Sequence, residues 1–512
     1  MKLSRSSMLY GTLLLTGTSV FSQLVGFLYR IFLSRLIGAE RMGLYQLIMP
    51  VYSVMMSMTA IGLTVAVSNL SAQYRALHNR RAIMQVRSRC LGAFFLLFLP
   101  IACVVLLFYD PISVYLLGDA RTQLGLLLLL PCIFLTGIEN LHKHFFYGTG
   151  NIRPPAAVEL CEQLIRAGAV LGLLVFFLPQ NAERTVGLIV LGMICCELFS
   201  SLTLVTLYRR HMRGAEGLPG PGEAPSMLSR RIAAIAVPIA ITSLLGNLMG
   251  AATAVLIPQR LVHGGMEVSH AMSAFGILCG MTLPMLLLPT AFIGALGLVL
   301  VPKLAESCAL GRMDEVRRRT HKALLATSIL TMPAMAILSV LGPTIGVFLF
   351  KEPAAGDYIA PLAFGVLLSC YESVLGGVLS GVGRQAASAR ASLISGVVQL
   401  LFTYFLVGIP GLGLGGYVLG FLVSTALDVL LKWYHLRRAT GLKPEFFQWL
   451  AAPALAALLM GLVVNLLFPF LLGAGLDGVP ACLCCLIFGG ILYLAALSAQ
   501  GVHPSALFHL GK

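Results

Sequence analysis

Three polar residues and a glycine are spaced along the first long apolar segment of the chain at helical intervals. Ser19, Gln23, Gly26 and Arg30 are separated by four, three and four positions, so a helix places them on one face. An arginine on such a face can bind a phosphate through charge-assisted hydrogen bonds. Arg30 lies about 33 Å along a helix that starts at residue 8. Snorkelling to the nearby membrane interface is therefore an equally good interpretation.

A second charged group lies in a later apolar segment, at Glu159, Glu162, Gln163 and Arg166. Glu162 precedes Arg166 by four positions, which is the favourable orientation for an ion pair within a helix. Two interpretations stay open for this group. It forms either a neutralised structural pair or the hydrophilic wall of a cavity.

Other apolar segments also contain polar residues, and charges there are functional candidates because they are costly in a membrane. Near Glu139, the neighbours His142, Lys143 and His144 indicate either a phosphate-binding end or a solvated helix end. The remaining members of this set are Asn69, Gln73, Glu197, Asn247, Glu372 and Asp428. From all these groups we predict that the substrate cavity is lined by Gln23, Arg30, Arg35, Asn69, Glu159, Glu162, Arg166 and Asn247.

Known catalytic and metal-binding motifs are absent from the sequence. There is no G-x-x-x-x-G-K-[ST] phosphate loop and no H-E-x-x-H, and the C-x-x-C of Cys482 and Cys485 has no histidine or second C-x-x-C near it. We therefore expect no enzyme activity, no metal site and no cofactor. A coupling ion, either a proton or sodium, stays open.

Few charges are available to cover the surfaces of soluble domains in a chain of 512 residues. Charged residues make up 11%, against about a quarter in ordinary soluble proteins, and hydrophobic residues make up 58%. This composition disfavours a soluble enzyme, a disordered chain and a nucleic-acid binder, the last despite a net charge of +15. It predicts an all-α integral membrane protein.

Apolar runs of roughly 20 residues, enough to span a bilayer, occur about fourteen times. The predicted spans are 8–36, 44–70, 90–109, 122–147, 155–178, 186–208, 231–258, 271–301, 323–350, 358–381, 388–409, 412–433, 447–471 and 480–499. If the N-terminus is cytoplasmic, 27 Lys and Arg residues fall on the inside and 6 on the outside. In this count Lys143 and Lys432 are inside charges. The bias predicts a multi-pass membrane protein with both termini in the cytoplasm.

The longest polar stretch, 211–229, is rich in Gly and Pro and predicts a flexible cytoplasmic linker. It separates a predicted N-lobe of six spans, 1–210, from a C-lobe of six spans, 230–438. Two further spans follow in 439–512. The linker thus predicts two six-helix lobes and a C-terminal helix pair.

The two predicted lobes also share an internal sequence repeat. Glu139 precedes Gly148-Thr149-Gly150 by nine residues, and Glu372 precedes Gly381-Val382-Gly383 by nine, an offset of 233. After the second and eighth spans, Leu70 and Leu304 match at an offset of 234. Because six spans separate the copies, the repeat is parallel, with its axis along the membrane normal. We expect Glu139 and Glu372 to be equivalent, and a substrate cavity to lie between the lobes.

The opening residues resemble a known family. Residues 21–30 (FSQLVGFLYR), 33–40 (LSRLIGAE), 43–46 (GLYQ) and 62–71 (GLTVAVSNLS) are similar to the stage V sporulation protein B group. That group belongs to the polysaccharide-transporter branch of the MOP exporter superfamily, beside the lipid II flippases. The resemblance implies a MATE-like fold and a flippase that moves an undecaprenyl-pyrophosphate-linked saccharide across the bacterial plasma membrane by alternating access. The implied cargo is a peptidoglycan precursor for spore cortex or cell wall.

The lipid II flippases hold pyrophosphate with arginines of the first span and its repeat partners. Tyr29 and Gln23 align with two such positions, and Arg30 lies one residue away. Arg30 and Arg35 are nevertheless our candidates because they bring positive charge to the cavity wall. The first span has an arginine and no acid, which favours an anionic cargo. Glu159 and Glu162 keep a cation-coupled, MATE-type multidrug antiporter as the alternative, and a non-transporting cell-wall scaffold is a third. We expect a monomer in the phospholipid bilayer that binds no nucleic acid.

Overall fold

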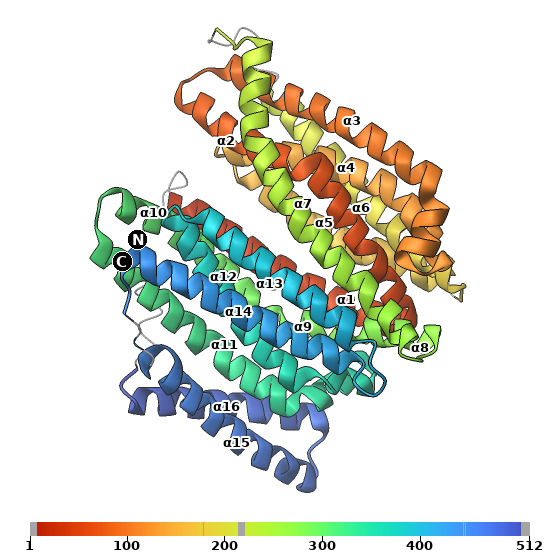
Figure 1. The fold of residues 1–512 in the computed structure, drawn as a ribbon, viewed down its shortest axis with the longest axis vertical. Helices are drawn as coiled ribbons and strands as arrows, with labels where there is room; N and C mark the ends of the chain where they lie inside the picture. Colours follow the sequence, from red (N-terminus) through yellow and green to blue (C-terminus); the bar gives the residue numbers. More distant parts are fainter. Residues whose placement is uncertain (1–7, 178, 213–220, 444, 446, 503–512) are drawn as a thin grey trace. The chain divides into compact units, whose positions relative to one another are not determined.

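The described chain is built of helices. The computed structural model describes residues 8–177, 179–212, 221–443, 445 and 447–502, and no strand occurs within these ranges. Thirteen helical stretches there are long and apolar enough to cross a membrane (Figure 1). The first of them, Gly17–Ala76, contains two predicted spans, so the count is consistent with about fourteen. The predicted all-α membrane class is therefore confirmed.

The helices group into two compact units, which we describe separately. Unit 1 consists of Met1–Gln259 and Glu267–Gly276. Its longer helices are α1 (Met8–Met56), α2 (Gly62–Ala76), α3 (Arg80–Pro111), α4 (Gln123–Gly148), α5 (Arg153–Phe177), α6 (Ala182–Met212), most of α7 (Pro225–His263), and α8 (Val268–Gly276). Its short helical turns are η1 (Ser57–Ile61), η2 (Ile112–Leu117) and η3 (Ala120–Thr122).

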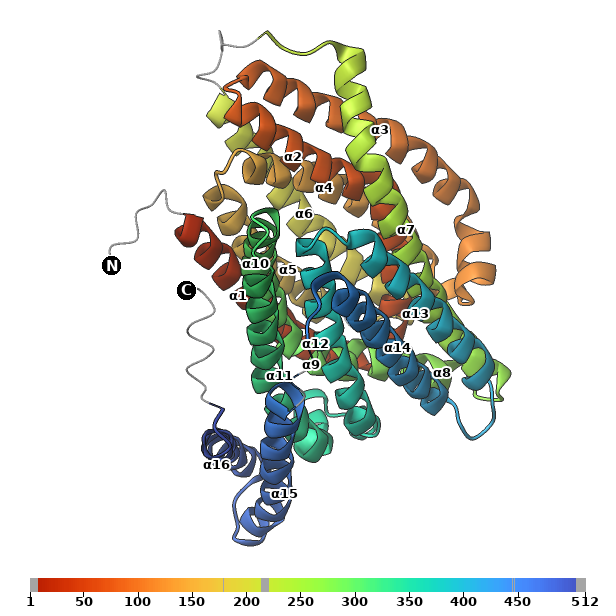
Figure 2. The same ribbon diagram turned by 60° about the vertical axis from the view of Figure 1, so that its left-hand side comes forward.

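Unit 2 consists of Arg260–Met266 and Ile277–Lys512. Its longer helices are α10 (Leu288–Ala309), α11 (Met313–Phe350), α12 (Ile359–Gly381), α13 (Gln385–Leu406), α14 (Leu414–Thr440), α15 (Ala452–Gly473) and α16 (Gly478–Ala499). Its shorter elements are η4 (Ile277–Thr282), α9 (Leu283–Leu286), η5 (Pro353–Gly356) and η6 (Phe447–Ala451). Within this unit α15 packs against both α16 and α11 (Figure 2).

The predicted linker joins the last residues of α6 to the start of α7. α6 ends at Met212 and α7 begins at Pro225, while residues 213–220 lie outside the described part of the chain. Most of α7, together with α8, belongs to unit 1. The two units are defined by contacts between residues, whereas the predicted six-plus-six division is defined by the sequence repeat. The six-plus-six division therefore stays a proposal.

A single glycine bends the first helix. Gly38 lies inside α1 with φ of 80° and ψ of 174°, a conformation that side chains with a Cβ rarely adopt. The sequence break between the first two predicted spans therefore coincides with a kink in a continuous helical stretch. Because the chain continues as helix on both sides of Gly38, the two predicted spans belong to one bent helical stretch.

Candidate functional site

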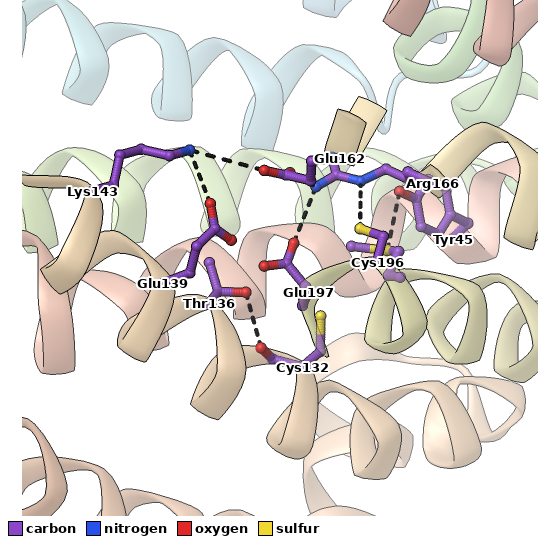
Figure 3. A network of polar contacts seen from close by, with 10 residues as sticks. Tyr45, Cys132, Thr136, Glu139, Lys143, Glu162, Arg166, Cys196 and Glu197 are labelled. Atoms are coloured by element: carbon purple, nitrogen blue, oxygen red, sulfur yellow. Dashed lines mark hydrogen bonds and ion pairs between the residues drawn. The ribbon is translucent and has the colours of Figure 1, made fainter. Parts of the chain in front are cut away.

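Five charged side chains from three helices form a buried group in unit 1, which we call the unit 1 charge cluster (Figure 3). Glu139 and Lys143 come from α4, Glu162 and Arg166 from α5, and Glu197 from α6. They meet because α6 packs against both α4 and α5. The carboxylate side chains of Glu139, Glu162 and Glu197 are 2%, 7% and 2% exposed, so they lie in the core of the unit.

The ion pairs of this cluster join into one network. Within α4, Nζ of Lys143 lies 2.9 Å from Oε1 of Glu139, and within α5, Nη2 of Arg166 lies 2.6 Å from Oε1 of Glu162. Between helices, Nη2 of Arg166 lies 3.0 Å from Oε1 of Glu197, and Nζ of Lys143 lies 3.9 Å from Oε2 of Glu162. Both intrahelical pairs have the acid four residues before the base, which brings the two side chains onto one helix face. The network therefore ties α4, α5 and α6 together.

The charges of the unit 1 charge cluster do not balance. It holds three carboxylates and two cations. Oε2 of Glu197 is buried and has no hydrogen-bond partner among the described residues. A buried carboxylate is costly unless it carries a proton or meets a further cation. The surplus acid is thus the part of the network that can exchange a proton or a cation.

A metal ion does not fit this cluster. Glu162, Cys196 and Glu197 have potential ligand atoms within 4.8 Å of one another, which is close enough to share an ion. The guanidinium of Arg166 already contacts all three, since Nε donates to Sγ of Cys196 at 3.5 Å and Nη2 donates to both carboxylates. A metal ion at that point would be repelled by the guanidinium. The arginine is therefore the internal cation of this donor set.

Unit 2 contains a related group, the unit 2 charge cluster, formed by Glu372 of α12, Ser392 of α13, and Asp428 and Lys432 of α14. Nζ of Lys432 lies 2.8 Å from Oε1 of Glu372 and 3.2 Å from Oδ2 of Asp428. Ser392 Oγ donates to Oδ2 of Asp428 at 3.0 Å. The Lys432 side chain is 4% exposed, and Oδ1 of Asp428 is buried without a hydrogen-bond partner among the described residues. This cluster also has one more acid than bases.

The same helix ending follows the acid of α4 and the acid of α12. Gly150 and Gly383 have φ of 70° and 76°, in the left-handed region that favours glycine. The next N–H groups, those of Asn151 and Arg384, each donate to the carbonyl five residues earlier, at 3.0 and 2.8 Å. This pattern of hydrogen bonds is the Schellman motif. The repeated Gly-x-Gly triplets therefore have one structural cause in both units.

A close helix contact aligns the two repeat copies. A Cβ on Gly148 would lie 2.8 Å from Cβ of Ser71, and a Cβ on Gly381 would lie 2.9 Å from Cβ of Leu304. Ser71 and Leu304 are 233 residues apart, as are the two glycines. The predicted match of Leu70 with Leu304 at 234 is therefore wrong by one residue. The common offset supports the proposed equivalence of the acids nine residues before each glycine.

The predicted residues of the first helix lie on its unpacked side. Gln23, Arg30 and Arg35 are exposed in α1. On the same helix Tyr29 and Leu33 are buried in a core with residues of α5 and α6. The exposed residues of the polar stripe therefore lie on a different side of α1 from the apolar contacts of Tyr29 and Leu33.

The other predicted residues are dispersed. Asn69 is exposed on α2, and Glu159 is half-buried on α5, one turn before Glu162. Asn247 of α7 donates through Nδ2 to Oγ of Ser57 in η1. Of the predicted cavity residues, the charge cluster thus contains Glu162 and Arg166.

Four charged residues of the clusters were absent from the predicted site, namely Lys143, Glu197, Asp428 and Lys432. Lys143 and Lys432 were counted as inside charges at the ends of spans, but their side chains are 14% and 4% exposed and lie in ion pairs. Without these two, the inside count falls from 27 to 25 against 6. Glu197 and Asp428 were named only among the polar residues within the apolar segments. An available signal was the i, i+4 spacing of Asp428 and Lys432, the same spacing as in the predicted pair of α5.

Comparisons with known proteins identify relatives of the chain. Residues 8–308 match the family model described as "Polysaccharide biosynthesis protein". The chain is 25% identical over 435 residues to Stage V sporulation protein B of Bacillus subtilis (strain 168). The aligned region covers 84% of this chain and 83% of that protein. The chain is 22% identical over 426 residues to Lipid II flippase MurJ of the same organism, with 77% and 76% covered. The resemblance predicted from the opening residues is confirmed.

Solved structures share the fold of the chain. Lipid II flippase MurJ in an inward closed conformation matches with a TM-score of 0.67 at 12% identity, over 94% of this chain and 97% of that one. An inward-facing multidrug resistance MATE family transporter of the MOP superfamily matches with a TM-score of 0.65 at 15% identity, over 83% and 96%. At such identities the likeness concerns the fold alone, and it confirms the predicted MATE-like and lipid-flippase-like class.

Proposed function

The chain belongs to the polysaccharide biosynthesis protein family, and we propose that it is a flippase that moves a polyprenyl-linked saccharide across a membrane. Its helices make it a multi-pass membrane protein. The family and the relatives, one of them a flippase by name, support a transporter and not an enzyme. The nature of the cargo is the proposed part, and it depends on the chemistry of α1.

The observation that carries the proposal is the exposure of Arg30 within a membrane-spanning helix. Arg30 lies in the candidate span Gly17–Ala76 and is exposed, while Tyr29 beside it is buried. Arginine within a span is costly unless it faces water, a polar interface or an anion. A phosphate-bearing cargo supplies such an anion and binds a guanidinium through two parallel hydrogen bonds. A positive group on the unpacked face of α1 therefore supports an anionic cargo.

We assign the phosphate to Arg30 and Arg35, and polar contacts to the saccharide to Gln23, Asn69 and Asn247. The cargo is of the undecaprenyl-pyrophosphate type. The name of the relative Stage V sporulation protein B supports a peptidoglycan precursor for spore cortex or cell wall. The acid Glu159 and the base Arg166 then belong to the inner part of the cavity wall, and the buried Glu162 holds Arg166 in place by its ion pair.

Transport proceeds by alternating access of two lobes, 1–210 and 230–438, joined by the 211–229 linker and followed by the helix pair in 439–512. The parallel repeat at an offset of 233 supports this division, because duplicated lobes can open alternately to the two sides. The 25 to 6 bias of basic residues supports cytoplasmic termini in a bacterial plasma membrane. The protein acts as a monomer, and a proton or sodium ion is the candidate coupling ion.

A second function, a cation-coupled antiporter of the MATE type, is favoured by one observation. The unit 1 charge cluster has three buried carboxylates against two cations, and Glu197 Oε2 is unpartnered among the described residues. A surplus buried acid is suited to bind a proton or a cationic substrate. The two functions differ in the charge of the cargo, which is negative for the flippase and positive for the antiporter.

Complementation of a flippase-depleted bacterium, paired with a cationic-dye efflux assay, separates these functions. The flippase proposal predicts growth rescue without dye efflux, and loss of rescue on Arg30→Ala. Arg210→Ala, at an exposed arginine in the last turn of α6, is the matched control and retains rescue. Dye efflux without rescue, abolished by Glu197→Gln, would select the antiporter.

A further inference from the structure

An apolar groove on the surface of unit 1 is lined by residues of α3, α7 and the η1–α2 region, and we call it the α3–α7 groove. Its volume is about 270 Å³. Leu96 and Leu97 of α3 and Ala233 and Val237 of α7 contribute apolar lining. All lining residues belong to unit 1. The groove is separate from the charge cluster of α4, α5 and α6 and from the polar face of α1.

Small residues create this groove. A Cβ on Gly62 would lie 2.2 Å from the carbonyl oxygen of Ala236, so α2 and α7 touch at this point. Beside that contact, Ala233 is exposed and contributes one methyl group to the lining. The neighbouring leucines Leu96 and Leu97 are 74% and 42% exposed. Apolar surface is thus left uncovered by the unit itself.

Polarity changes along the groove in the same direction on both helices. Arg89 of α3 and Ser229 of α7 lie in the lining before the apolar residues of their helices. Leu96 follows Arg89 by seven residues and Val237 follows Ser229 by eight, which is about 11–12 Å along a helix. One end of the groove is therefore polar and cationic, and the rest is apolar. This arrangement matches a lipid whose headgroup precedes its acyl chain.

The polar end has positive charge that the protein does not neutralise. Arg89 of the lining is exposed, and so is Arg230, which follows the lining residue Ser229. Neither arginine takes part in the ion pairs found among the described residues. The nearby acid Glu223 is already paired with Arg231, at 2.7 Å. The backbone N–H of Glu223 donates to Gln85 Oε1 of α3 at 2.9 Å, which holds the start of α7 beside α3. An anion at this end thus meets cations without a competing carboxylate.

We propose that the α3–α7 groove binds an anionic phospholipid of the bilayer, with its phosphate at Arg89 and an acyl chain along Leu96, Leu97 and Val237. A basic residue near the membrane surface attracts an anionic lipid by about 1 kcal/mol. None of the lining residues is among those assigned to the proposed cargo.

Native mass spectrometry of the full chain in detergent tests the charge at this site. Phosphatidylglycerol and phosphatidylcholine with identical chains are titrated against the purified protein. The wild type binds phosphatidylglycerol more tightly, and Arg89→Gln weakens that binding about fivefold. Arg80→Gln makes the same charge change at an exposed position of α3 outside the groove, and it retains wild-type binding. Equal binding by the Arg89 variant and the wild type, or an equal loss in both variants, would overturn the proposal.

A steric pair of variants tests the apolar part of the site. Ala233→Trp fills the groove and removes binding of both lipids, whereas Ala234→Trp places the same ring at the adjacent exposed alanine, which is not in the lining. Retained phosphatidylglycerol binding by the Ala233 variant contradicts the assignment. A competition arm with a polyprenyl phosphate completes the test. If the polyprenyl phosphate displaces phosphatidylglycerol at equal concentration, the groove belongs to the cargo lipid and the phospholipid proposal is overturned.

Discussion

Nζ of Lys432 in α14 lies 2.8 Å from Oε1 of Glu372 in α12, so an internal ammonium joins two helices of unit 2. The same ammonium lies 3.2 Å from Oδ2 of Asp428. In unit 1, Arg166 similarly contacts acids of two helices, its own α5 and α6. Each unit thus supplies a cation of its own to acids that would otherwise be unpaired in the apolar interior.

Lys432→Met should destabilise unit 2. It leaves Glu372 and Asp428 without their shared cation, and breaking a buried pair by removing one partner costs about 3–5 kcal/mol. We expect the lower part of this range, because the Glu372 side chain is 30% exposed. Thermal unfolding in detergent measures the loss. Lys443→Met, at an exposed lysine, is the control, and equal stability of the two variants would contradict the role of Lys432.

The unit 1 charge cluster should tolerate the loss of a negative charge better than the loss of a positive one. Glu197→Gln balances two acids with two bases and keeps an oxygen that accepts from Arg166, so we expect a change within about 1 kcal/mol. Arg166→Met leaves Glu197 unpaired and leaves Glu162 with only the 3.9 Å contact to Lys143, so it should cost about 3 kcal/mol or more. The two variants are compared by unfolding under the same conditions. Similar losses would mean that the surplus of acid has no energetic consequence.

Gly148→Ala should destabilise the contact between α4 and α2. The added Cβ would lie 2.5 Å from the carbonyl oxygen of Ser68, a backbone atom that cannot move alone, so we expect a loss of about 1–3 kcal/mol. Gly172→Ala is the control because no atom lies within 4 Å of its Cβ. Helix propensity predicts a gain of up to about 1 kcal/mol there. A Gly148 variant as stable as the wild type would refute the close contact.

Much of the fold could be predicted from the sequence because the bilayer imposes a simple rule. Each spanning helix needs about 20 apolar residues, so the pattern locates the apolar stretches. It does not locate every boundary, because α3 and α11 begin ten residues before the predicted spans 90–109 and 323–350. The repeat was visible for a related reason. Gly150 and Gly383 occupy a left-handed conformation at a helix end, and few residue types suit it. A backbone conformation that only glycine adopts readily can therefore be recognised from the positions of glycine in a single sequence.

The contents of the charge clusters could be predicted only in part. The pair Glu162–Arg166 was visible because both partners lie on one helix. Lys432 was counted as an inside charge at the end of the predicted span 412–433, although α14 continues to Thr440 and the lysine is buried. Its partner Glu372 lies 60 residues away, and only the packing of α12 against α14 brings them together. Tertiary packing, which no local pattern encodes, decided these positions.

The central claim is that arginines on α1 hold the phosphate of a lipid-linked saccharide. Flipping of a fluorescent undecaprenyl-pyrophosphate-linked saccharide in reconstituted vesicles tests it most directly. A hydrogen bond to a charged group contributes about 1.5–3 kcal/mol, so Arg30→Ala with Arg35→Ala should lower the rate at least tenfold. Arg210→Ala should retain the wild-type rate. Full flipping by the double variant, in vesicles that contain equal amounts of folded protein, would contradict the account.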